Sequence, residues 1–565
     1  RGVHALSSFA PTSGTPSQGH LGLRAYAFTY WPYVETLVYW GGSAGEGLIL
    51  APAAGVVDAA HRNGVQVLGT IFFPPTVYGG RLEWVEQFVE RRDDGTYPAA
   101  EAMVAVARYY GFDGWFINQE TEGANAETAR AFVEIAAAVT AADLHVEWYD
   151  AMTESGEVVW QEALNDQNDA FFQQPTREVS RTMFLDFGWT ADDLRASGER
   201  ARTLGRDPGD LFAGVDYQAR GTAGLSRLAP VLFPDQDPSG VSLALFRPDE
   251  TLWQDEENAD QRERELWVGA DGNPGQDDEG WGGVARYVPP AAAITTLPFL
   301  THFGSGQGRG YFVNGADLST RTWRAQGWSQ HGLQDRQPTW RWWVEGDPDR
   351  TNVSLDHEVA YQGGASLAID VEAGAGAHVR LFAADLVIPA EAALRVAYRA
   401  AAETPFAIGL TFADAPEAVE QIPLRSVNAW RETRAPLAAF AGRRLIALSV
   451  IAGGEPAVSL NVGRLALDVG PERTRAPHNV RVERRAQRPD GALAIGLVWD
   501  APAEPVHHYE VFQRLPDRSR VFVGGSSGPA AFLPSVTQTD SALRRLEVVA
   551  VSRTGHRSPA GTVQL

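Results

Sequence analysis

The stretch Gly111-Phe112-Asp113-Gly114-Trp115-Phe116-Ile117-Asn118-Gln119-Glu120-Thr121 places an amide and a carboxyl, two residues apart, directly after an apolar run. In a β-strand, the side chains at positions i and i+2 point to the same face. Asn118 and Glu120 are therefore expected side by side at the end of a buried strand. Barrel enzymes keep their catalytic groups at the C-terminal ends of such strands. The stretch thus predicts the working end of a parallel-stranded enzyme.

Apolar, strand-like runs alternate with helical stretches from about residue 25 to 320. Besides the opening stretch, the predicted strands are 34–40, 65–72, 144–149, 170–173, 182–186, 211–217, 241–246 and 297–303. The predicted helices are 56–63, 82–89, 99–110, 126–142 with Asn125 as N-cap, and 191–204. Repeated βα units of this kind predict a (β/α)8 TIM barrel. An open doubly wound sheet is the alternative, although no Gly-rich dinucleotide fingerprint follows the first predicted strand.

The pattern changes after about residue 345, where short alternating runs such as 366–371 and 378–382 are separated by turn residues. This spacing is typical of β-sandwiches. The last unit has the strand layout of a fibronectin type III module. We predict a catalytic barrel over 1–345, a carbohydrate-binding-like β-sandwich over 346–472 and a fibronectin type III-like β-sandwich over 473–565.

Composition excludes several classes of chemistry. The 565-residue chain has a formal net charge of -23, which argues against nucleic acid and anionic membranes as partners. It contains no cysteine, so disulfides, thiolate nucleophiles and iron–sulfur sites are excluded. All 48 basic residues other than histidine are arginine, which removes Schiff-base chemistry, pyridoxal phosphate anchoring and the P-loop lysine. A neutral or cationic substrate fits the negative charge better than an anionic one, and solubility alone explains the charge equally well.

Neither a metal nor a cofactor is expected for catalysis. The 12 histidines are scattered and form no H-x-x-H or H-E-x-x-H pattern, although a calcium site in the first sandwich is left open. No apolar run approaches the ~20 residues of a membrane span, and the opening residues Arg1 to His4 do not form a signal segment. We expect a monomer that does not bind membranes and is secreted or on the cell surface, with the cytoplasm as the alternative.

Glu120 is the first candidate for a general acid, because burial beside aromatic residues raises the pKa of a carboxyl. Glu122 is the rival acid. Most retaining glycosidases place a second carboxylate beside the acid, but the neighbour of Glu120 on the same strand face is the amide of Asn118. An amide can orient a substrate N-acetyl group, whose carbonyl oxygen then attacks C1. A two-carboxylate mechanism would need Asp150 or Asp216 instead.

Several ordered motifs resemble one known family, the endo-β-N-acetylglucosaminidases of glycoside hydrolase family 85. The resemblance covers roughly residues 25 to 345 and includes the opening stretch. Its other motifs are Gly64-Val65-Gln66-Val67-Leu68-Gly69-Thr70, Trp148-Tyr149-Asp150-Ala151-Met152, Trp160-Gln161, Phe303-Gly304-Ser305-Gly306-Gln307-Gly308, Phe312-Val313-Asn314-Gly315 and Gln334-Asp335-Arg336-Gln337-Pro338-Thr339-Trp340.

The resemblance implies cleavage of the GlcNAc–GlcNAc core bond of N-linked glycans with retention, through an oxazoline, together with transglycosylation. It implies that Glu120 is the acid/base, that Asn118 holds the acetamido group and that Tyr149 assists oxazoline formation. Trp160 is expected to stack on a sugar at the aglycone end. Four further residues are predicted to bind substrate: Phe187 and Trp189, although Asp186-Phe187-Gly188-Trp189 departs from the family pattern, and Trp115 and Gln307.

Two other interpretations stay open at the level of sequence. The barrel could be an inactive glycan-binding protein, although inactive barrels tend to lose the acid and this chain has both Asn118 and Glu120. The long acidic, Gly-rich insertion at 247–286 contains Trp253, Trp267 and Trp281. These tryptophans either form a wall of the cleft or only hold the loop in place.

Overall fold

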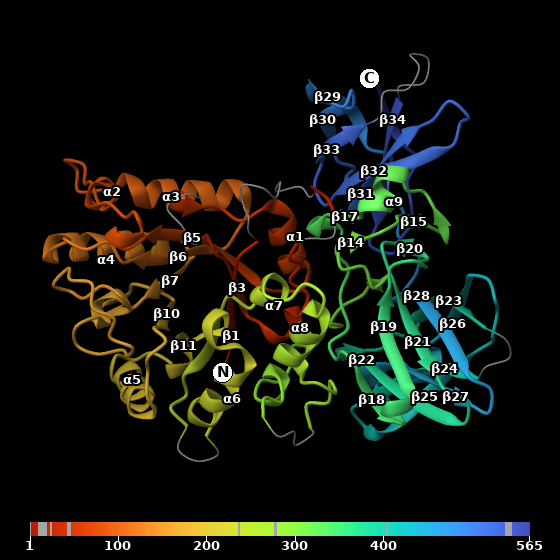
Figure 1. The fold of residues 1–565 in the computed structure, drawn as a ribbon, viewed down its shortest axis with the longest axis horizontal. Coiled ribbons are helices and arrows are strands. Elements are labelled where there is room, and N and C mark those ends of the chain that lie inside the picture. Colours follow the sequence, from red (N-terminus) through yellow and green to blue (C-terminus); the bar gives the residue numbers. More distant parts are fainter. Residues whose placement is uncertain are drawn as a thin grey trace.

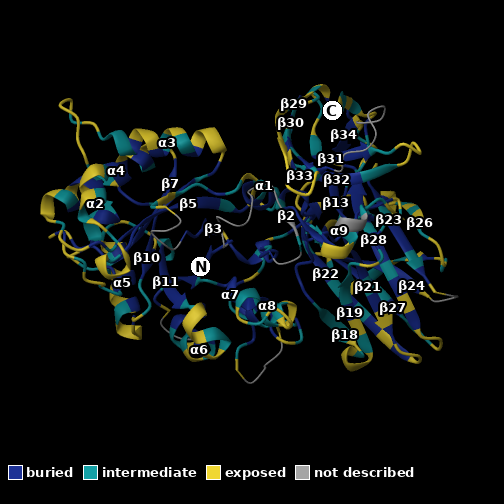
Figure 2. Ribbon diagram, turned by 45° about the horizontal axis from the view of Figure 1, so that its top comes forward, coloured by how far each residue is buried: buried dark blue, intermediate teal, exposed yellow. Residues whose placement is uncertain are grey.

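The computed structural model describes residues 2–9, 20–22, 25–41, 47–234, 238–275, 280–401, 405–536 and 545–565. A barrel with its helices forms one half of the molecule, and two β-rich units form the other half (Figure 1). Buried residues are concentrated in the barrel strands and between the sheets of the β-rich units, whereas the outward faces of the helices are exposed (Figure 2).

A closed ring of parallel strands forms the barrel, which confirms the predicted architecture. Its strands are β1 (Val3–Ser7), β3 (Thr36–Tyr39), β5 (Gln66–Phe73), β6 (Gly114–Gln119), β7 (His145–Tyr149), β10 (Thr182–Leu185), β11 (Leu211–Asp216) and β12 (Ser242–Phe246). The ring closes because β12 pairs with β1, β1 with β3 and β3 with β5, all in parallel. The short β4 (Ile49–Leu50) adds an antiparallel strand to β5. The open-sheet alternative is therefore wrong.

The five predicted helices are all present around the ring: α1 (Ala54–Arg62), α2 (Leu82–Phe88), α3 (Pro98–Tyr110), α4 (Ala126–Ala141) and α5 (Ala191–Thr203). Three further helices were not predicted: α6 (Tyr217–Leu232), α7 (Glu250–Trp253) and α8 (Ala259–Val268). Asn125 caps α4 by accepting hydrogen bonds from the backbone of Glu127 and Thr128. Gly111 ends α3 with a φ of 74°, a left-handed conformation that glycine adopts at little cost.

Three strand predictions need correction. The barrel begins at β1, which lies before the predicted alternation. The predicted strand 170–173 is instead the 3₁₀ helix Asp169–Phe171 followed by the short β8 (Gln173–Gln174). The predicted strand 297–303 contains β13 (Phe299–Thr301), which pairs antiparallel with β28 (Val458–Asp468) of the next unit. An apolar run indicates that a segment is buried, but it does not say in which sheet.

The first β-rich unit is a sandwich of two sheets, as predicted. One sheet has the order β19 (Thr351–Asp356), β21 (Ser366–Val371), β28, β23 (Ala393–Ala400) and β26 (Arg431–Pro436), and the other has the order β18 (Trp343–Gly346), β22 (Ala375–Val387), β27 (Arg444–Gly454), β24 (Phe406–Phe412) and β25 (Ala415–Leu424). Fully buried side chains such as Leu381, Leu410 and Leu465 fill the space between them. The predicted boundary at residue 345 falls inside β18, and β13 also belongs to this sandwich.

The C-terminal unit is a second sandwich with sheets of three and four strands. Its strands are β29 (His478–Gln487), β30 (Leu493–Asp500) and β33 (Ala530–Val536) in one sheet, and β32 (Arg520–Ser526), β31 (Val506–Arg514), β34 (Arg545–Ser552) and β35 (Gly561–Gln564) in the other. It contacts the barrel directly, because Ser527 donates a hydrogen bond to Asp58 of α1. Tyr311, in the segment between barrel and first sandwich, donates to the buried Glu510 across 2.8 Å. These contacts join the C-terminal unit to the barrel and to the segment that follows it.

In the part of the chain that the structure describes, every helix is too short or too polar to cross a membrane.

Candidate active site

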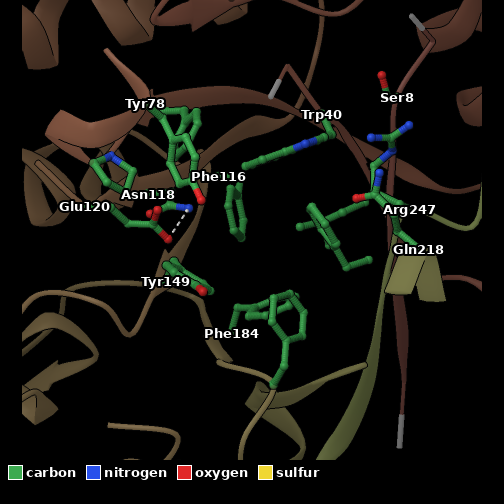
Figure 3. A pocket seen from close by; sticks show the side chains of 15 residues that line it. Ser8, Trp40, Tyr78, Phe116, Asn118, Glu120, Tyr149, Phe184, Gln218 and Arg247 are labelled. Carbon is green, nitrogen blue, oxygen red and sulfur yellow. Dashed lines mark hydrogen bonds between the residues drawn. The ribbon is translucent and has the colours of Figure 1, made fainter. Parts of the chain in front are cut away.

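A cavity of about 550 Å3 opens at the C-terminal ends of the barrel strands (Figure 3). Its wall is largely aromatic: Trp40, Phe72, Phe116, Tyr149, Phe184, Phe187 and Phe246. Asn118 and Glu120 project into it from the end of β6. A mostly apolar cavity with a few convergent polar groups is the usual form of a small-molecule site. This site lies where barrel enzymes place theirs.

Strand alternation brings the predicted pair together. Phe116 and Asn118 line the cavity, whereas Trp115 and Ile117, which alternate with them along the strand, belong to the core between strands and helices. Nδ2 of Asn118 donates a hydrogen bond to Oε1 of Glu120 across 3.3 Å. The prediction that the two side chains lie on one face is confirmed.

The environment of Glu120 suits proton transfer near neutral pH. Burial raises the pKa of this carboxyl to about 7, although the hydrogen bonds from Asn118 and Trp160 act in the opposite direction. Nε1 of Trp160 lies 3.4 Å from the same Oε1. A pKa close to the working pH allows one group to donate a proton and then to accept one.

The other end of the Asn118 amide is open to a ligand. Its Oδ1 is buried and has no hydrogen-bond partner among the described residues. A buried acceptor without a donor is costly unless a bound molecule satisfies it. Asn118 can thus accept one N–H from a substrate while it donates to Glu120.

Tyr149 also faces the cavity, on the next strand, β7. Its hydroxyl donates a 2.5 Å hydrogen bond to Oδ1 of Asp186. Burial and the neighbouring Asp186 hold the pKa of Tyr149 well above its ordinary value, so the phenol stays protonated. Burial also raises the pKa of Asp186. The backbone N–H of Asp186 in turn donates to Asp150 across 3.1 Å.

Two of the predicted sugar-stacking aromatics reach the site. Phe187 lines the cavity and packs edge-on against Phe184, with ring centroids 5.7 Å apart. Trp160 stands at the rim with 41% of its surface exposed, and its indole reaches Glu120. Both can therefore contact a bound sugar.

Three other residues predicted to bind substrate do not line the described cavity. Trp115 is fully buried and its indole donates to the carbonyl of Met103 in α3. Trp189 is 4% exposed and donates to the carbonyl of Gly214. Gln307 lies in β14 (Gln307–Gly308), donates to the carbonyl of Ala25, and does not line the described cavity. Each of these side chains donates its hydrogen bond to a backbone carbonyl of the scaffold. Lying within a motif of the family therefore did not place these residues in the cavity.

The rival acid Glu122 and the two candidates for a second carboxylate, Asp150 and Asp216, do not line the described cavity. Glu122 accepts the backbone N–H of Thr76, and that hydrogen bond lowers its pKa. Asp216 caps α6 by accepting from Ala219. Asp150 is fully buried beneath the loop at Asp186. Glu120 is therefore the carboxyl that lines the described cavity, and its partner there is an amide.

Trp267 and Trp281 of the 247–286 insertion hold the loop in place. Trp267 is fully buried and packs near Phe28 and Tyr30. Trp281 donates to the carbonyl of Leu266. Neither lines the described cavity.

Several residues at or next to the cavity were not predicted from the sequence. Asp186, which does not line the cavity but contacts Tyr149, follows Phe184 at the end of β10 with the same two-residue spacing as Asn118 and Glu120, and this spacing could have revealed it. Gln218 and Arg247 follow the ends of β11 and β12, and both contact Glu250, at 3.0 and 2.7 Å. They form a polar wall opposite Glu120 (Figure 3). Tyr78, also at the cavity, is 76% exposed.

Comparisons with known proteins agree with this geometry. The family model described as Glycosyl hydrolase family 85 matches residues 11–311. A second family model, described as GH85 endohexosaminidases, C-terminal domain, matches residues 477–565. The cytosolic endo-beta-N-acetylglucosaminidase of Gallus gallus is 30% identical over 62% of this chain and 44% of its own length. The Homo sapiens protein of that name is 29% identical over 70% of this chain and 50% of its own. The chain thus spans about half the length of these curated relatives.

A solved structure extends the similarity to all three units. The glycoside hydrolase domain of Endo-D from Streptococcus pneumoniae R6 superimposes with a TM-score of 0.88 and 28% identity, covering 100% of this chain and 90% of that one. Barrel, both sandwiches and their order are therefore shared. The chain belongs to glycosyl hydrolase family 85.

Proposed function

We propose that the protein is an endo-β-N-acetylglucosaminidase that cleaves the GlcNAc-β1,4-GlcNAc core bond of N-linked glycans with retention, using the substrate's own acetamido group as nucleophile. One observation carries the mechanism: the group beside the acid Glu120 is the amide of Asn118, whose Oδ1 is buried and unsatisfied. A carboxylate nucleophile would be expected in a two-carboxylate retaining enzyme. The relatives, which are named endo-beta-N-acetylglucosaminidases, support the substrate class.

In the first step, Glu120 gives its proton to the oxygen that leaves with the second GlcNAc. The C1–O bond breaks while the acetamido carbonyl oxygen forms a new bond to C1, which yields an oxazolinium ion. Asn118 Oδ1 accepts the acetamido N–H and so aligns the carbonyl oxygen with C1 and stabilises the positive charge that develops on the ring. The ion keeps its N–H proton, hydrogen-bonded to Asn118 Oδ1, until the second step.

In the second step, Glu120 acts as the base. It takes a proton from a water molecule as the water oxygen attacks C1, the bond from C1 to the acetamido oxygen breaks, and the oxazolinium ring opens to the acetamido group with its N–H intact. Two inversions give overall retention. A sugar hydroxyl that replaces the water would give transglycosylation instead.

Tyr149 and Trp160 complete the site in this proposal. The Tyr149 hydroxyl, oriented by Asp186, lies beside the reacting acetamido group and supports its closure onto C1. Trp160 offers an exposed aromatic face at the rim, where the departing GlcNAc would stack. Glu120 and Trp160 thus meet on the leaving-group side.

A direct experiment would incubate the protein with a panel of N-glycopeptides bearing high-mannose, complex or trimmed-core glycans and weigh the products. Cleavage between the two core GlcNAc residues leaves exactly one GlcNAc on the peptide and retains the β-configuration at the new reducing end, which NMR detects before mutarotation. Intact glycopeptides throughout the panel would favour the inactive glycan-binding interpretation. Products that carry no acetamido group at the cleavage site would favour a two-carboxylate mechanism.

The curated relatives are named as cytosolic proteins. We therefore propose the cytoplasmic alternative for this chain in place of secretion. That the protein acts as a monomer stays a prediction.

A further inference from the structure

A second cavity, of about 610 Å3, lies on the first sandwich rather than on the barrel. It is a groove on the outer face of the sheet β18-β22-β27-β24-β25, on the side of the sandwich away from the C-terminal unit (Figure 1). It shares no lining residue with the cavity that contains Glu120. Any ligand it binds would occupy a separate site.

Strand register explains the shape of this groove. One row of side chains crosses all five strands on the outer face: Glu345, His378, Ile451, Ala407 and Pro423. In the next row on that face, Gly376 pairs with Gly453. Because neither residue has a side chain, the groove is deeper at this point. A Cβ added at Gly376 would meet no atom within 4 Å. The groove is therefore open space built by small residues.

The polar side of the groove is held in place by its own hydrogen bonds. The two ring nitrogens of His378 lie 2.7 Å from Oε2 of Glu345 and 2.8 Å from the Ser449 hydroxyl. Arg380 donates to the other oxygen of Glu345 across 3.3 Å and balances its charge. Gly409 is required here, because a Cβ would lie 2.2 Å from Ser449 Oγ. The polar groups are thus pre-organised, and an uncharged ligand suits the paired charges.

Peptide-binding modes fit this groove poorly. The groove lies on the face of a sheet, and strand addition requires a free sheet edge. Grooves that bind proline-rich segments are lined with aromatic rings, whereas the aromatic residue among the described lining residues, Phe406, is 4% exposed. A ligand with hydroxyls on its rim and apolar patches on its faces matches what the groove offers.

We propose that this groove binds a neutral oligosaccharide. Sugar hydroxyls pair with Glu345 and with the exposed amide of Gln421, while the apolar face of a ring lies over Ile451 and Pro423. This inference rests on the proposed function, because it assumes that the barrel acts on a glycan-bearing substrate. The sandwich would then bind another part of the glycans on that substrate. Binding in the groove requires no cleavage.

The test is a calorimetric titration of the full chain with mannopentaose and, separately, with cellopentaose. Both sugars are neutral and lack an acetamido group, so the reaction proposed for the barrel cannot consume them. Hydrogen exchange measured by mass spectrometry then locates the bound sugar. We expect one of the sugars to bind saturably and to protect β24 and β27 from exchange.

Three variants make the result specific. Gly376→Phe fills the groove, Gln421→Ala removes a polar contact, and Glu417→Ala changes an exposed residue of the same strand outside the groove. We expect Gly376→Phe to weaken binding at least tenfold and Gln421→Ala several-fold, with Glu417→Ala unchanged. All three should cleave a short glycopeptide as the parent does, which shows that the barrel is intact.

Absence of saturable binding by both sugars, or equal binding by Gly376→Phe and the parent, would overturn the proposal. Protection confined to the barrel strands would do the same. The titration needs no turnover, so a parent chain that fails to cleave glycopeptides would refute the proposed function without touching this result.

Discussion

Asn118 donates its Nδ2–H to Oε1 of Glu120 across 3.3 Å, and the opposite end of the same amide, Oδ1, is buried without a partner. One side chain therefore connects the acid to the place where a substrate N–H would bind. Asn118 thus takes part both in proton transfer, through its hydrogen bond to Glu120, and in alignment of the nucleophile, through Oδ1. It also predicts that changes at these two positions have different kinetic signatures.

Glu120→Gln should lower kcat for glycopeptide hydrolysis by a factor of about 10²–10⁴ or more, because no other cavity carboxyl can supply the proton. The near-isosteric amide should leave substrate binding intact. Steady-state kinetics combined with equilibrium binding of the uncleaved glycopeptide checks both. Turnover close to that of the parent would refute the acid assignment.

Asn118→Gln should slow hydrolysis while still allowing transfer from a preformed sugar oxazoline. The longer side chain misplaces the acetamido group before ring closure, but an oxazoline has already passed that step. Mass spectrometry of transfer to a GlcNAc-peptide measures the second activity. A variant that rejects the oxazoline as donor would contradict the alignment role.

The alkaline limb of kcat/KM should fall near pH 7, because the first step needs protonated Glu120 and burial raises its pKa to about 7. Trp160→Phe removes a donor that stabilises the carboxylate, so the limb should move to higher pH. A pH–rate profile of both proteins decides this. An unmoved or lowered limb in the variant would show that the indole does not act on Glu120.

Trp160→Ala should mainly raise KM for the acceptor in transglycosylation, since the exposed indole face is lost at the rim. Initial rates over a range of acceptor concentrations, with oxazoline donor fixed, measure this. Trp189→Phe is a matched control, because Trp189 is buried away from the cavity. An unchanged acceptor KM in Trp160→Ala would remove Trp160 from the acceptor site.

Glu120 should also destabilise the folded protein at neutral and alkaline pH. Its folded pKa of about 7 lies above the ordinary value of 4.5, so its full contribution to stability is present below pH ~4.5 and is lost as pH rises through ~7. Glu120→Gln should therefore be more stable than the parent at pH 8, by an amount on the order of 1–3 kcal/mol, and nearly equal to it at pH 4.5. Denaturant unfolding at the two pH values measures the difference; the same gap at both would disprove the linkage.

Local patterns in the sequence predicted much of the barrel correctly. The two-residue period of β6 and the Asn125 cap of α4 involve only neighbouring residues, so the chain specifies them without knowledge of the fold. The segment at 297–303 shows the limit of prediction from local patterns. Its apolar run is real, but β13 pairs with β28, more than 160 residues later, and no local rule identifies that partner.

The same limit applies to the predicted site. Trp115 and Trp189 lie within promising motifs, yet both donate hydrogen bonds to scaffold carbonyls and face the packed core. Glu122 and Asp216 looked equivalent to Glu120 as carboxyls. Only Glu120 among them is placed in the described aromatic cavity, and burial there is what raises its pKa.

By itself, the sequence determined that an amide and a carboxyl share one strand face, because alternation along a strand is a local property of the backbone. It also determined what chemistry is absent, since no lysine or cysteine occurs. The tertiary structure alone decided which groups meet Glu120 and Tyr149. Trp160 approaches Glu120 from 40 residues away and Asp186 approaches Tyr149 from 37 residues away, because the parallel pairing of β6 with β7 and of β7 with β10 brings the ends of these strands together.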